Sequence, residues 1–349
     1  MKTARVTAKR RESELIIDRK TGRLYHIDLG SEDSLPRNIL LVGDPGRVDI
    51  ATRMFDGAKV DGRRAHREYV TAWGKYKDVP VAVMGTGIGT DNVEIALVEL
   101  DAMFRYNYKK DEWNTTNPDN RMTLIRVGTS GSPRADLRVG TLGVTDYAIG
   151  LDNTGLFYLH RDSDSYRENP ESVFYTPIEV DKNAKTIWQA LQEMLPPLAK
   201  VALRPYVSTP DKQLVARMLE VGDELSLAGK VVGITSGITT SASGFYAPQG
   251  RAIGTDPHIL IPDLQEILAH MEAKLQEFGV SGIRAATNEM ESSALFRIAG
   301  EYQGHRVGTV CAILANRAEG EFITPEGYAK AVDGALIIGL ETLARENKG

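Results

Sequence analysis

The sequence feature that most constrains the fold is an alternation, beginning at Asn38, of short apolar runs with helix-like patterns. The runs ILLVG and VPVAVMG are followed by the amphipathic patterns VDIATRMF and VEIALVELDAMF, and TLIRVG is followed by TLGVTDY. Strands that alternate with helices form a mixed or mostly parallel sheet covered by helices. The sequence therefore predicts an α/β fold.

The alternation continues through KVVGITS, PDLQEILAHMEAKLQEF, SSALFRIAGEY and RVGTVCAILA to a terminal helix around residues 328–345. Neither a low-complexity linker nor a repeat divides it, so we expect one domain over residues 25–349 after a flexible arm at residues 1–24. Two polar segments interrupt the pattern, residues 109–120 and 160–172, and their Asn, Asp, Ser and Pro content predicts surface loops. A lid or a subunit contact is the alternative to simple insertions.

The composition argues against several classes of function. With 42 basic and 47 acidic residues and a formal charge of -5, the chain offers no broad basic surface for nucleic acid. Cys311 is the single cysteine, which rules out an internal disulfide and favours a reducing compartment, so we expect a cytoplasmic protein. The N-terminal segment lacks the apolar stretch of a secretory signal or membrane span, so no membrane partner is expected. The six histidines are scattered, so no metal centre is predicted.

The segment LLVGDPGRV is a first candidate anion site. Asp44 suits the N-cap of the following helix and Pro45 its first position, while Gly43 lets backbone amides approach a ligand closely. A helix N-terminus favours negative charge, and Arg47 one turn along would complete an anion pocket. The alternative is an ordinary strand-to-helix turn without a ligand.

The segment LIRVGTSGS is a second candidate, because Arg126 lies inside an otherwise apolar strand. A buried arginine needs an anion or several acceptors, and Thr129 and Ser130 supply hydroxyls beside it. The alternative is a structural ion pair with an Asp or Glu. Two such strand ends would converge at the carboxyl edge of the sheet, where open α/β sheets bind ligands.

The glycine-rich segment MGTGIGTDN does not match a dinucleotide-binding loop. Its glycines are Gly85, Gly87 and Gly89, so the final glycine of the G-x-G-x-x-G pattern is missing. No strand ending in an acidic residue follows at the expected distance, and Asp101 lies in a helical pattern instead. We interpret the segment as a tight turn with backbone packed on backbone.

These segments, together with HREYVTAW, NEMESSAL and ILANR, resemble the nucleoside phosphorylase family, which includes uridine phosphorylases, purine nucleoside phosphorylases and nucleosidases. The resemblance runs from about Tyr25 to Leu343, apart from the two polar segments. It implies a central, mixed, partly closed sheet flanked by helices, with the site at the strand ends and completed by a neighbouring subunit. It implies no cofactor, with inorganic phosphate as co-substrate.

The resemblance assigns the binding of phosphate to Gly43, Arg47, Arg67, Arg126 and Thr129. Arg67, from HREYVTAW, reaches the phosphate across a subunit interface. His26, from LYHIDL, reaches the ribose 5'-hydroxyl of the adjacent protomer. Both side chains therefore serve the partner's site under this interpretation.

The segment TNEMESSAL has two interpretations. As a helix start, Asn288 and Glu291 would form a capping box. By resemblance, Glu289, Met290 and Glu291 lie along the ribose, and Glu291 takes its 2'- and 3'-hydroxyls. The same oxygens cannot fill both roles, so the two interpretations compete.

The family divides by base in the segment ITTSASGFYAPQGRAIG. Here Gln249 and Arg251, after Phe245, resemble the uracil-recognition segment of uridine phosphorylases. A glutamine amide can accept from uracil N3–H and donate to one carbonyl, arginine donates to a carbonyl, and a ring packs against the flat face. The alternative is that both polar residues belong to an exposed loop. Purine phosphorylases use an acidic or asparagine side chain near N7, and we find no such replacement here.

Arg317 of ILANR supports the same pocket by resemblance, with Leu314 and Ala315 lining it where the family usually has Ile and Val. The predicted activity is the phosphorolysis of uridine, and also of deoxyuridine or thymidine, to uracil or thymine and the sugar 1-phosphate. The predicted catalytic residues are Arg126, Arg251 and Glu291. A purine nucleoside phosphorylase, a nucleosidase that uses water, and a non-catalytic nucleoside-binding protein are the alternatives.

A site shared between subunits implies a homo-oligomer. Some hexameric relatives hold a monovalent cation between subunits through a glutamate that matches Glu68 and a serine where this chain has Asn92. That departure and the two polar segments favour a homodimer.

Overall fold

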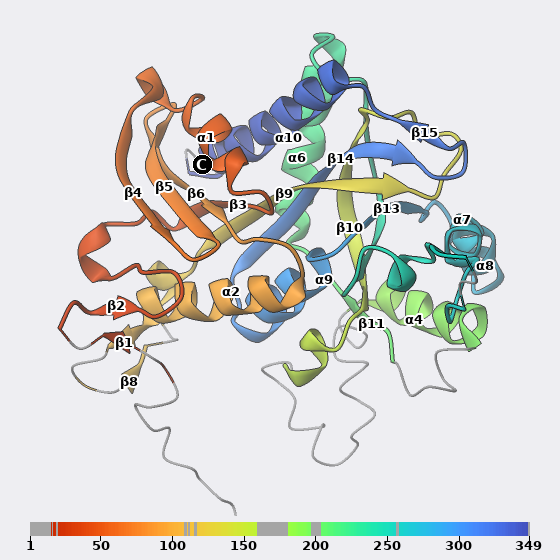
Figure 1. Cartoon of the computed structure of the whole chain (residues 1–349), viewed down its shortest axis with the longest axis horizontal. Helices are drawn as coiled ribbons and strands as arrows, with labels where there is room; N and C mark the ends of the chain where they lie inside the picture. The colour runs from red at the N-terminus through yellow and green to blue at the C-terminus, as the bar shows by residue number, and fades with distance from the viewer. Residues whose placement is uncertain are drawn as a thin grey trace, which may run out of the picture.

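The computed structural model describes residues 15, 17–18, 20–107, 110, 112–114, 117–158, 181–196, 204–255 and 258–347. These residues form a large mixed β-sheet with helices on both of its faces (Figure 1), which confirms the predicted α/β fold. Within these ranges, no helix is both long enough and apolar enough to cross a membrane.

The main sheet has the strand order β15-β14-β10-β12-β13-β9-β3-β6-β5-β4, and β11 pairs with β10. Its strands are β3 (Asn38–Val42), β4 (Val60–His66), β5 (Tyr69–Tyr76), β6 (Val79–Gly85), β9 (Thr123–Ser132), β10 (Leu142–Leu151), β11 (Tyr206–Ser208), β12 (Ile234–Ala242), β13 (Ala285–Glu289), β14 (Arg306–Asn316) and β15 (Glu321–Phe322).

Part of this sheet closes on itself, as expected. Strand β14 pairs in parallel with β9 as well as antiparallel with β10, so β9, β14, β10, β12 and β13 form a ring. The ring is completed by one antiparallel pair between β13 and β9, Asn288 opposite Gly131. Because this pair lies near the carboxyl ends of both strands, those two ends meet at one place.

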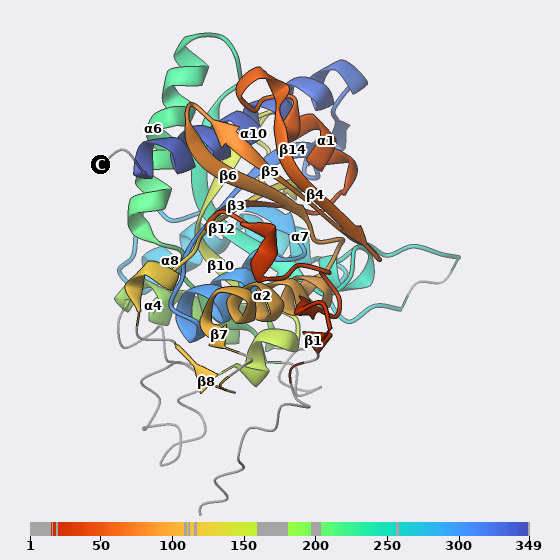
Figure 2. The same ribbon diagram turned by 90° about the vertical axis from the view of Figure 1, so that its left-hand side faces the viewer.

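The helices are α1 (Gly46–Thr52), α2 (Thr90–Arg105), α4 (Lys182–Met194), α6 (Lys212–Leu227), α7 (Leu264–Ala269), α8 (Met271–Glu277), α9 (Ser292–Ala294) and α10 (Pro325–Glu346). Helix α9 continues as π-helical turns over Leu295–Tyr302. Figure 2 shows α2 below the curved layer of β4, β5 and β6, with α6 and α10 on the other side of the sheet.

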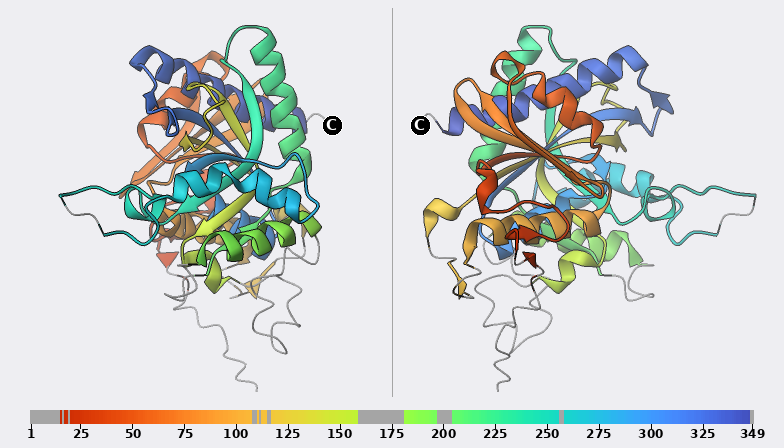
Figure 3. Two further views of the ribbon diagram at one scale, coloured as in Figure 1. Left: turned by 90° about the vertical axis from the view of Figure 1, so that its right-hand side faces the viewer. Right: turned by 60° about the vertical axis from the view of Figure 1, so that its left-hand side comes forward.

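Strand alternation produces separate apolar cores on the two sides of the sheet. Leu40 and Val42 of β3 pack in a cluster with residues of α1, α6 and α10. Ile39 and Leu41, which point the opposite way, pack with residues of α2 and the helix after β13. A third cluster joins β10 and β12 to α4, α7 and α8 (Figure 3). The rigid core thus holds the strand ends in place from several directions.

The inside of the ring is polar. Thr145, Thr239 and Thr287, from three different strands, form a chain of hydroxyls with 2.7 Å between successive oxygens. A Cβ on Gly143 of β10 would lie 2.6 Å from Thr287 Cγ2 of β13, so the ring is narrow where these two strands face each other. The threonine hydroxyls hydrogen-bond to one another there. Charged side chains lie at the end of the ring where β13 meets β9.

Three expectations about local structure are wrong in detail. TLGVTDY, which we grouped with the helical patterns, belongs to strand β10. The pattern PDLQEILAHMEAKLQEF is split at His270 into α7 and α8. Helix α1 begins at Gly46 rather than Pro45, and the Asp44 carboxylate accepts a hydrogen bond from the Gly46 N–H at 2.8 Å.

The predicted arm and the two polar segments are described only in part. Within residues 1–24, β1 (Ile17–Asp18) pairs with β2 (Arg23–Leu24), and Leu24 is buried, so folded structure begins before the boundary that we assigned. Within residues 109–120, β8 (Glu112–Trp113) pairs with β7 (Tyr106–Asn107). The segment 160–172 lies outside the described residues.

Candidate functional site

The two strand ends that we identified as anion sites are adjacent. Strands β3 and β9 are parallel neighbours, so their carboxyl ends lie side by side. There Arg47 Nη2 donates to Thr129 Oγ1 at 3.4 Å. Arg47 is only 8% exposed, and its Nε has no hydrogen-bond partner among the described residues. A buried cation with an unused donor is suited to an anionic ligand.

The glycine-rich turn after β6 packs against the turn after β3. A Cβ on Gly85 would come within 3.0 Å of Pro45 Cα, and a Cβ on Gly43 within 3.5 Å of the Gly87 carbonyl oxygen. Gly87 has a φ of 76° and Gly89 a φ of 98°, which side chains rarely tolerate. The interpretation of MGTGIGTDN as a tight turn with close backbone packing is therefore confirmed.

Arg126 lies at the centre of a group of buried charges. Its Nη1 lies 3.1 Å from Glu289 Oε2, and its Nη2 makes a short contact with Glu291 Oε2. The second oxygen of Glu291 accepts from the Gly89 N–H at 2.8 Å. Although burial opposes the charge, the carboxylates of Glu291 and Glu289 raise the pKa of Arg126 above its ordinary value. The structural ion pair that we kept as an alternative is thus present in the structure.

The capping box of Asn288 and Glu291 is not formed. Asn288 lies in β13, and the carboxylate of Glu289 instead accepts from the N–H groups of Glu291, at 3.0 Å, and of Ser292. Ser241 also donates to Glu289. Glu291 is therefore free of the capping role, and the partly buried Met290 lies between the two carboxylates in sequence.

Two neighbours to which the sequence analysis gave no role in the site, Gly128 and Cys311, shape the position of Arg126. A Cβ on Gly128 would lie 1.8 Å from Arg126 Nη1, so the guanidinium occupies the space that a side chain would fill. The same Nη1 donates to the buried Cys311 Sγ at 3.4 Å. Burial raises the pKa of Cys311 to about 12, which keeps its thiol neutral. Only glycine at position 128 leaves room for this arrangement.

The predicted base-recognition residues lie on the turn that follows β12. Gln249 ends a short 3₁₀ turn, Ala247–Gln249, and is only 3% exposed, so it is not an exposed loop residue. Its side-chain amide donates from Nε2 to the Glu289 carbonyl at 3.3 Å, and its Oε1 accepts from Arg317 Nη2. Gln249 therefore links the charged group at Arg126 to Arg317.

Arg251 and Arg317 form a cationic pair near the base-recognition turn. In the described part of the chain, no carboxylate lies within ion-pair distance of either guanidinium, and Arg251 Nε and two nitrogens of Arg317 lack hydrogen-bond partners. Burial lowers the pKa of Arg251, and burial followed by the charge of Arg251 lowers the pKa of Arg317 to about 10. The Arg251 guanidinium stacks on the Phe245 ring, 4.2 Å from its centroid. Such a site favours a ligand with carbonyl oxygens or negative charge.

Arg317 reaches this position because of a second glycine. A Cβ on Gly131 would lie 2.5 Å from Arg317 Nε. Ala315, which is buried, pairs with Gly131 and so lies beside this contact. Leu314 lies at the bulge of β14 and packs against the core cluster that includes α10. The structure therefore places Ala315 next to Arg317, and Leu314 on the other side of the strand.

His26 and Arg67 lie together in a separate group. His26 Nδ1 is 2.6 Å from Glu99 Oε1, and the His26 carbonyl is 3.0 Å from His66 Nδ1. Arg67 is exposed on the turn between β4 and β5, and its guanidinium stacks on the Tyr25 ring, 4.7 Å from the centroid. The contacts of these two side chains join them to this group and not to Arg126.

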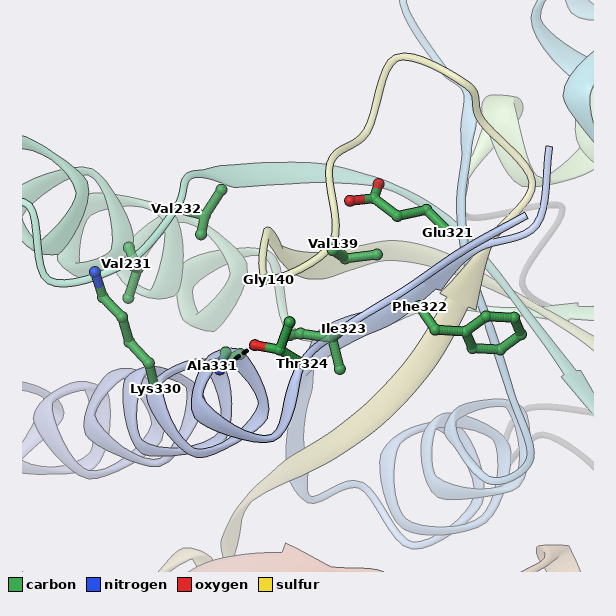
Figure 4. A pocket seen from close by; sticks show the side chains of 11 residues that line it. Val139, Gly140, Val231, Val232, Glu321, Phe322, Ile323, Thr324, Lys330 and Ala331 are labelled. Atoms are coloured by element: carbon green, nitrogen blue, oxygen red, sulfur yellow. Dashed lines mark hydrogen bonds between the residues drawn. The ribbon is translucent and has the colours of Figure 1, made fainter. Parts of the chain in front are cut away.

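A further pocket lies away from these residues, between β15, the loop before β10 and the start of α10 (Figure 4). It measures about 190 Å³, which is smaller than a typical cofactor site. Its Thr324 hydroxyl accepts from the Gly327 N–H, and its Lys330 donates to the Gly229 carbonyl. Because these two polar groups already bond to the protein, they offer little to a polar ligand.

Sequence reasoning missed Gly128 and Gly131, which make room for the two guanidinium groups. A signal was present, because a glycine inside a strand often marks close approach of another group. It also missed Ser241, which supports Glu289, and Gln265, whose contact with Gln249 is described below. These contacts depend on the packing of distant segments and leave no local pattern.

Comparison with known proteins agrees with this architecture. The Thermococcus kodakarensis uridine phosphorylase is 28% identical over 90% of this chain and 84% of its own length. The Escherichia coli uridine phosphorylase is 23% identical over 92% and 97%, respectively. A solved Trypanosoma brucei nucleoside phosphorylase, described as showing uridine phosphorylase activity, is 29% identical, covers 95% of this chain and 99% of its own, and has a TM-score of 0.81. The sequence profile of the phosphorylase superfamily matches residues 37–336, and the chain therefore belongs to that superfamily.

Proposed function

We propose that this protein is a uridine phosphorylase, a pentosyltransferase that converts uridine and inorganic phosphate to uracil and ribose 1-phosphate. The observation that carries the proposal is the group formed by Gln249, Arg251 and Arg317. It presents one amide and two guanidinium groups without a carboxylate beside them in the described ranges. Relatives and a solved structure with this activity support the assignment.

The chemistry of this group favours a pyrimidine-dione. Uracil presents an N3–H between two carbonyl groups, which a glutamine amide and an arginine match with donors and an acceptor. A purine base would call for an acid or asparagine near N7, and Asp and Glu side chains are not in ion-pair contact with Arg251 or Arg317 in the described chain. The Glu291 carboxylate is paired with Arg126 rather than with Arg251 or Arg317. We therefore assign it to the ribose hydroxyls and not to the base.

In the proposed reaction, phosphate is held by Arg47, Arg126 and Thr129, together with Arg67 from a neighbouring subunit. A phosphate oxygen forms a bond to the anomeric carbon while the bond from that carbon to N1 of uracil breaks. The bonding electrons leave with the base, which then takes a proton from water. No side-chain nucleophile is needed, so the protein acts by positioning the reactants and stabilising separated charge.

Glu291 and Arg126 connect the proposed phosphate site to the proposed ribose site. Within the protein, the Glu291 carboxylate is paired with the Arg126 guanidinium. When both substrates bind, Arg126 donates to phosphate and Glu291 accepts from the ribose hydroxyls, while the ion pair keeps both groups aligned. Positive charge that develops on the sugar is then stabilised by the phosphate and by Glu291.

One assay tests the reaction type and the base together. The protein is incubated with uridine, thymidine, 2'-deoxyuridine and inosine, each with and without phosphate, and base release is measured. We expect phosphate-dependent release of uracil as the fastest reaction. Release without phosphate would indicate a nucleosidase, faster cleavage of inosine a purine phosphorylase, and binding without release a non-catalytic protein.

The proposed enzyme is a homodimer in the cytoplasm that needs no cofactor besides its co-substrate phosphate. The separation of Arg67 and His26 from Arg126 supports a site completed by a partner. Co-expression of Arg67→Ala with Arg251→Ala, a variant that is expected to fold normally, tests it. If the two arginines come from different subunits, the mixed dimers regain one working site, and about a quarter of wild-type activity returns under random pairing. A site within one chain predicts no recovery.

A further inference from the structure

The turn that carries Gln249 and Arg251 rests on helix α7. Gln265, in the first turn of α7, donates from Nε2 to the Gln249 backbone carbonyl at 2.9 Å. The Oε1 of Gln265 in turn accepts from Asn288 Nδ2 of strand β13. A three-residue chain therefore runs from the sheet through α7 to the base-recognition turn.

A glycine brings the turn and the helix into direct contact. Gly250 has a φ of 73°, and a Cβ on it would lie 2.9 Å from Leu264 Cβ and 3.2 Å from the Ile261 carbonyl oxygen. Its own N–H donates to the Ala247 carbonyl at 3.0 Å. The turn therefore lies directly against the start of α7, where Gln265 can reach its backbone.

Helix α7 is a firm support for this contact. Leu264 and Leu268 are 2% and 1% exposed and belong to the core cluster of β10 and β12. Asn288, which holds Gln265, is 3% exposed and pairs with Gly131, the residue that makes room for Arg317. The pair of β13 and β9 thus contacts Gln265 through Asn288 and Arg317 through Gly131.

We propose that Gln265, held by Asn288, is a positioning residue for base recognition. The inference rests on the proposed function, because it takes Gln249 as the residue that reads uracil. Each end of the Gln249 side-chain amide makes one hydrogen bond within the protein, and each keeps a second donor or lone pair that a base can use. The bond from Gln265 goes to the Gln249 backbone, so it persists when the side chain turns to the base.

Steady-state kinetics of matched variants test this role. Gln265→Leu removes both hydrogen bonds at similar size, and Gln265→Glu keeps the acceptor for Asn288 but removes the donor to Gln249. Both variants are expected to raise the KM for uridine about tenfold, the effect of one lost buried hydrogen bond, and to leave the KM for phosphate unchanged. Gln276→Leu, at an exposed position of α8, is the control and should match wild type. A purely packing role predicts wild-type kinetics for Gln265→Glu and would overturn the proposal.

Hydrogen–deuterium exchange gives a readout that does not depend on activity. The amides of Gly250 and Arg251 donate within the turn, to Ala247 and Tyr246. They should exchange faster in Gln265→Leu than in wild type or Gln276→Leu, while amides of β13 keep their rates. Unchanged exchange in the turn contradicts the positioning role. If the wild-type enzyme fails to cleave uridine but exchange in the turn still rises, the proposed substrate is wrong and the positioning role stands.

Discussion

Two arginine-containing regions of the site differ in how their charge is balanced. Arg126 lies between Glu289 and Glu291, so its positive charge is balanced by carboxylates of the protein. Arg251 and Arg317 lie near each other without a carboxylate in the described chain, and burial lowers the pKa of both. The charge of Arg126 has acidic partners within the protein. Arg251 and Arg317 keep N–H donors without hydrogen-bond partners in the described chain.

The difference separates stability from function. A buried cation that has acidic partners is costly to remove, because the acids are then left buried without compensation. A partly buried cation without such partners adds little to stability, and its unused donors are suited to a ligand. We therefore expect changes at Arg126 to affect folding and activity together, and changes at Arg251 to affect activity alone.

The largest expected effect tests this separation directly. Arg126→Met leaves Glu289 and Glu291 buried and unpaired, so it should lower the free energy of unfolding by about 3–5 kcal/mol and abolish turnover. Arg251→Met removes a cation that has no carboxylate partner in the described ranges, and it should change stability by less than about 0.5 kcal/mol. Urea unfolding of the two variants measures the contrast. Equal losses of stability would contradict it.

The next effect concerns the leaving group. Arg251→Ala removes a donor that stabilises the negative charge developing on uracil, so kcat should fall about a hundredfold. The KM for phosphate should stay close to wild type, because phosphate is bound at the other region. Initial rates at varied phosphate and saturating uridine measure both quantities. Wild-type turnover in this variant would refute the role of Arg251.

A smaller effect tests the space around Arg126. Gly128→Ala places a Cβ 1.8 Å from the present position of Arg126 Nη1, so the guanidinium must shift away from its carboxylates. We expect a loss of about 1–3 kcal/mol in stability and a lower kcat. Gly233→Ala, where a Cβ meets nothing within 4 Å, is the control for the general effect of the substitution. Equal behaviour of the two variants would exclude a positioning role for Gly128.

The smallest effect is a pH dependence. Burial and the neighbouring charge that lower the pKa of Arg317 would also lower that of a lysine, whose ordinary value is about 10.4. A lowered pKa means that charge is present at low pH and lost as the pH rises. In Arg317→Lys, the KM for uridine should therefore rise between about pH 7 and 9, relative to the profile of wild type. Parallel KM profiles of the two proteins would show that Arg317 is not desolvated in this way.

Local sequence patterns predicted much of the fold because each signal is contained in a short segment. The apolar runs of β3, β6 and β9 and the long helix α10 lie where the periodicity placed them. The segments that were predicted wrongly are those whose structure depends on distant parts of the chain. TLGVTDY lies in a strand because it pairs with β12 and β14 on both sides, which is a tertiary constraint.

The amino-acid sequence by itself determined the α/β class, the two strand ends that carry Arg47 and Arg126, and the family resemblance, because strand periodicity and motif spacing are local. Only the tertiary structure decided which charges meet. Closing the ring brings the end of β13 to the end of β9, which gives Arg126 two acidic partners. The same closure leaves Arg317 over Gly131 with no acid to neutralise it among the residues that the structure describes, because the partner of a buried charge depends on which chain segments pack together.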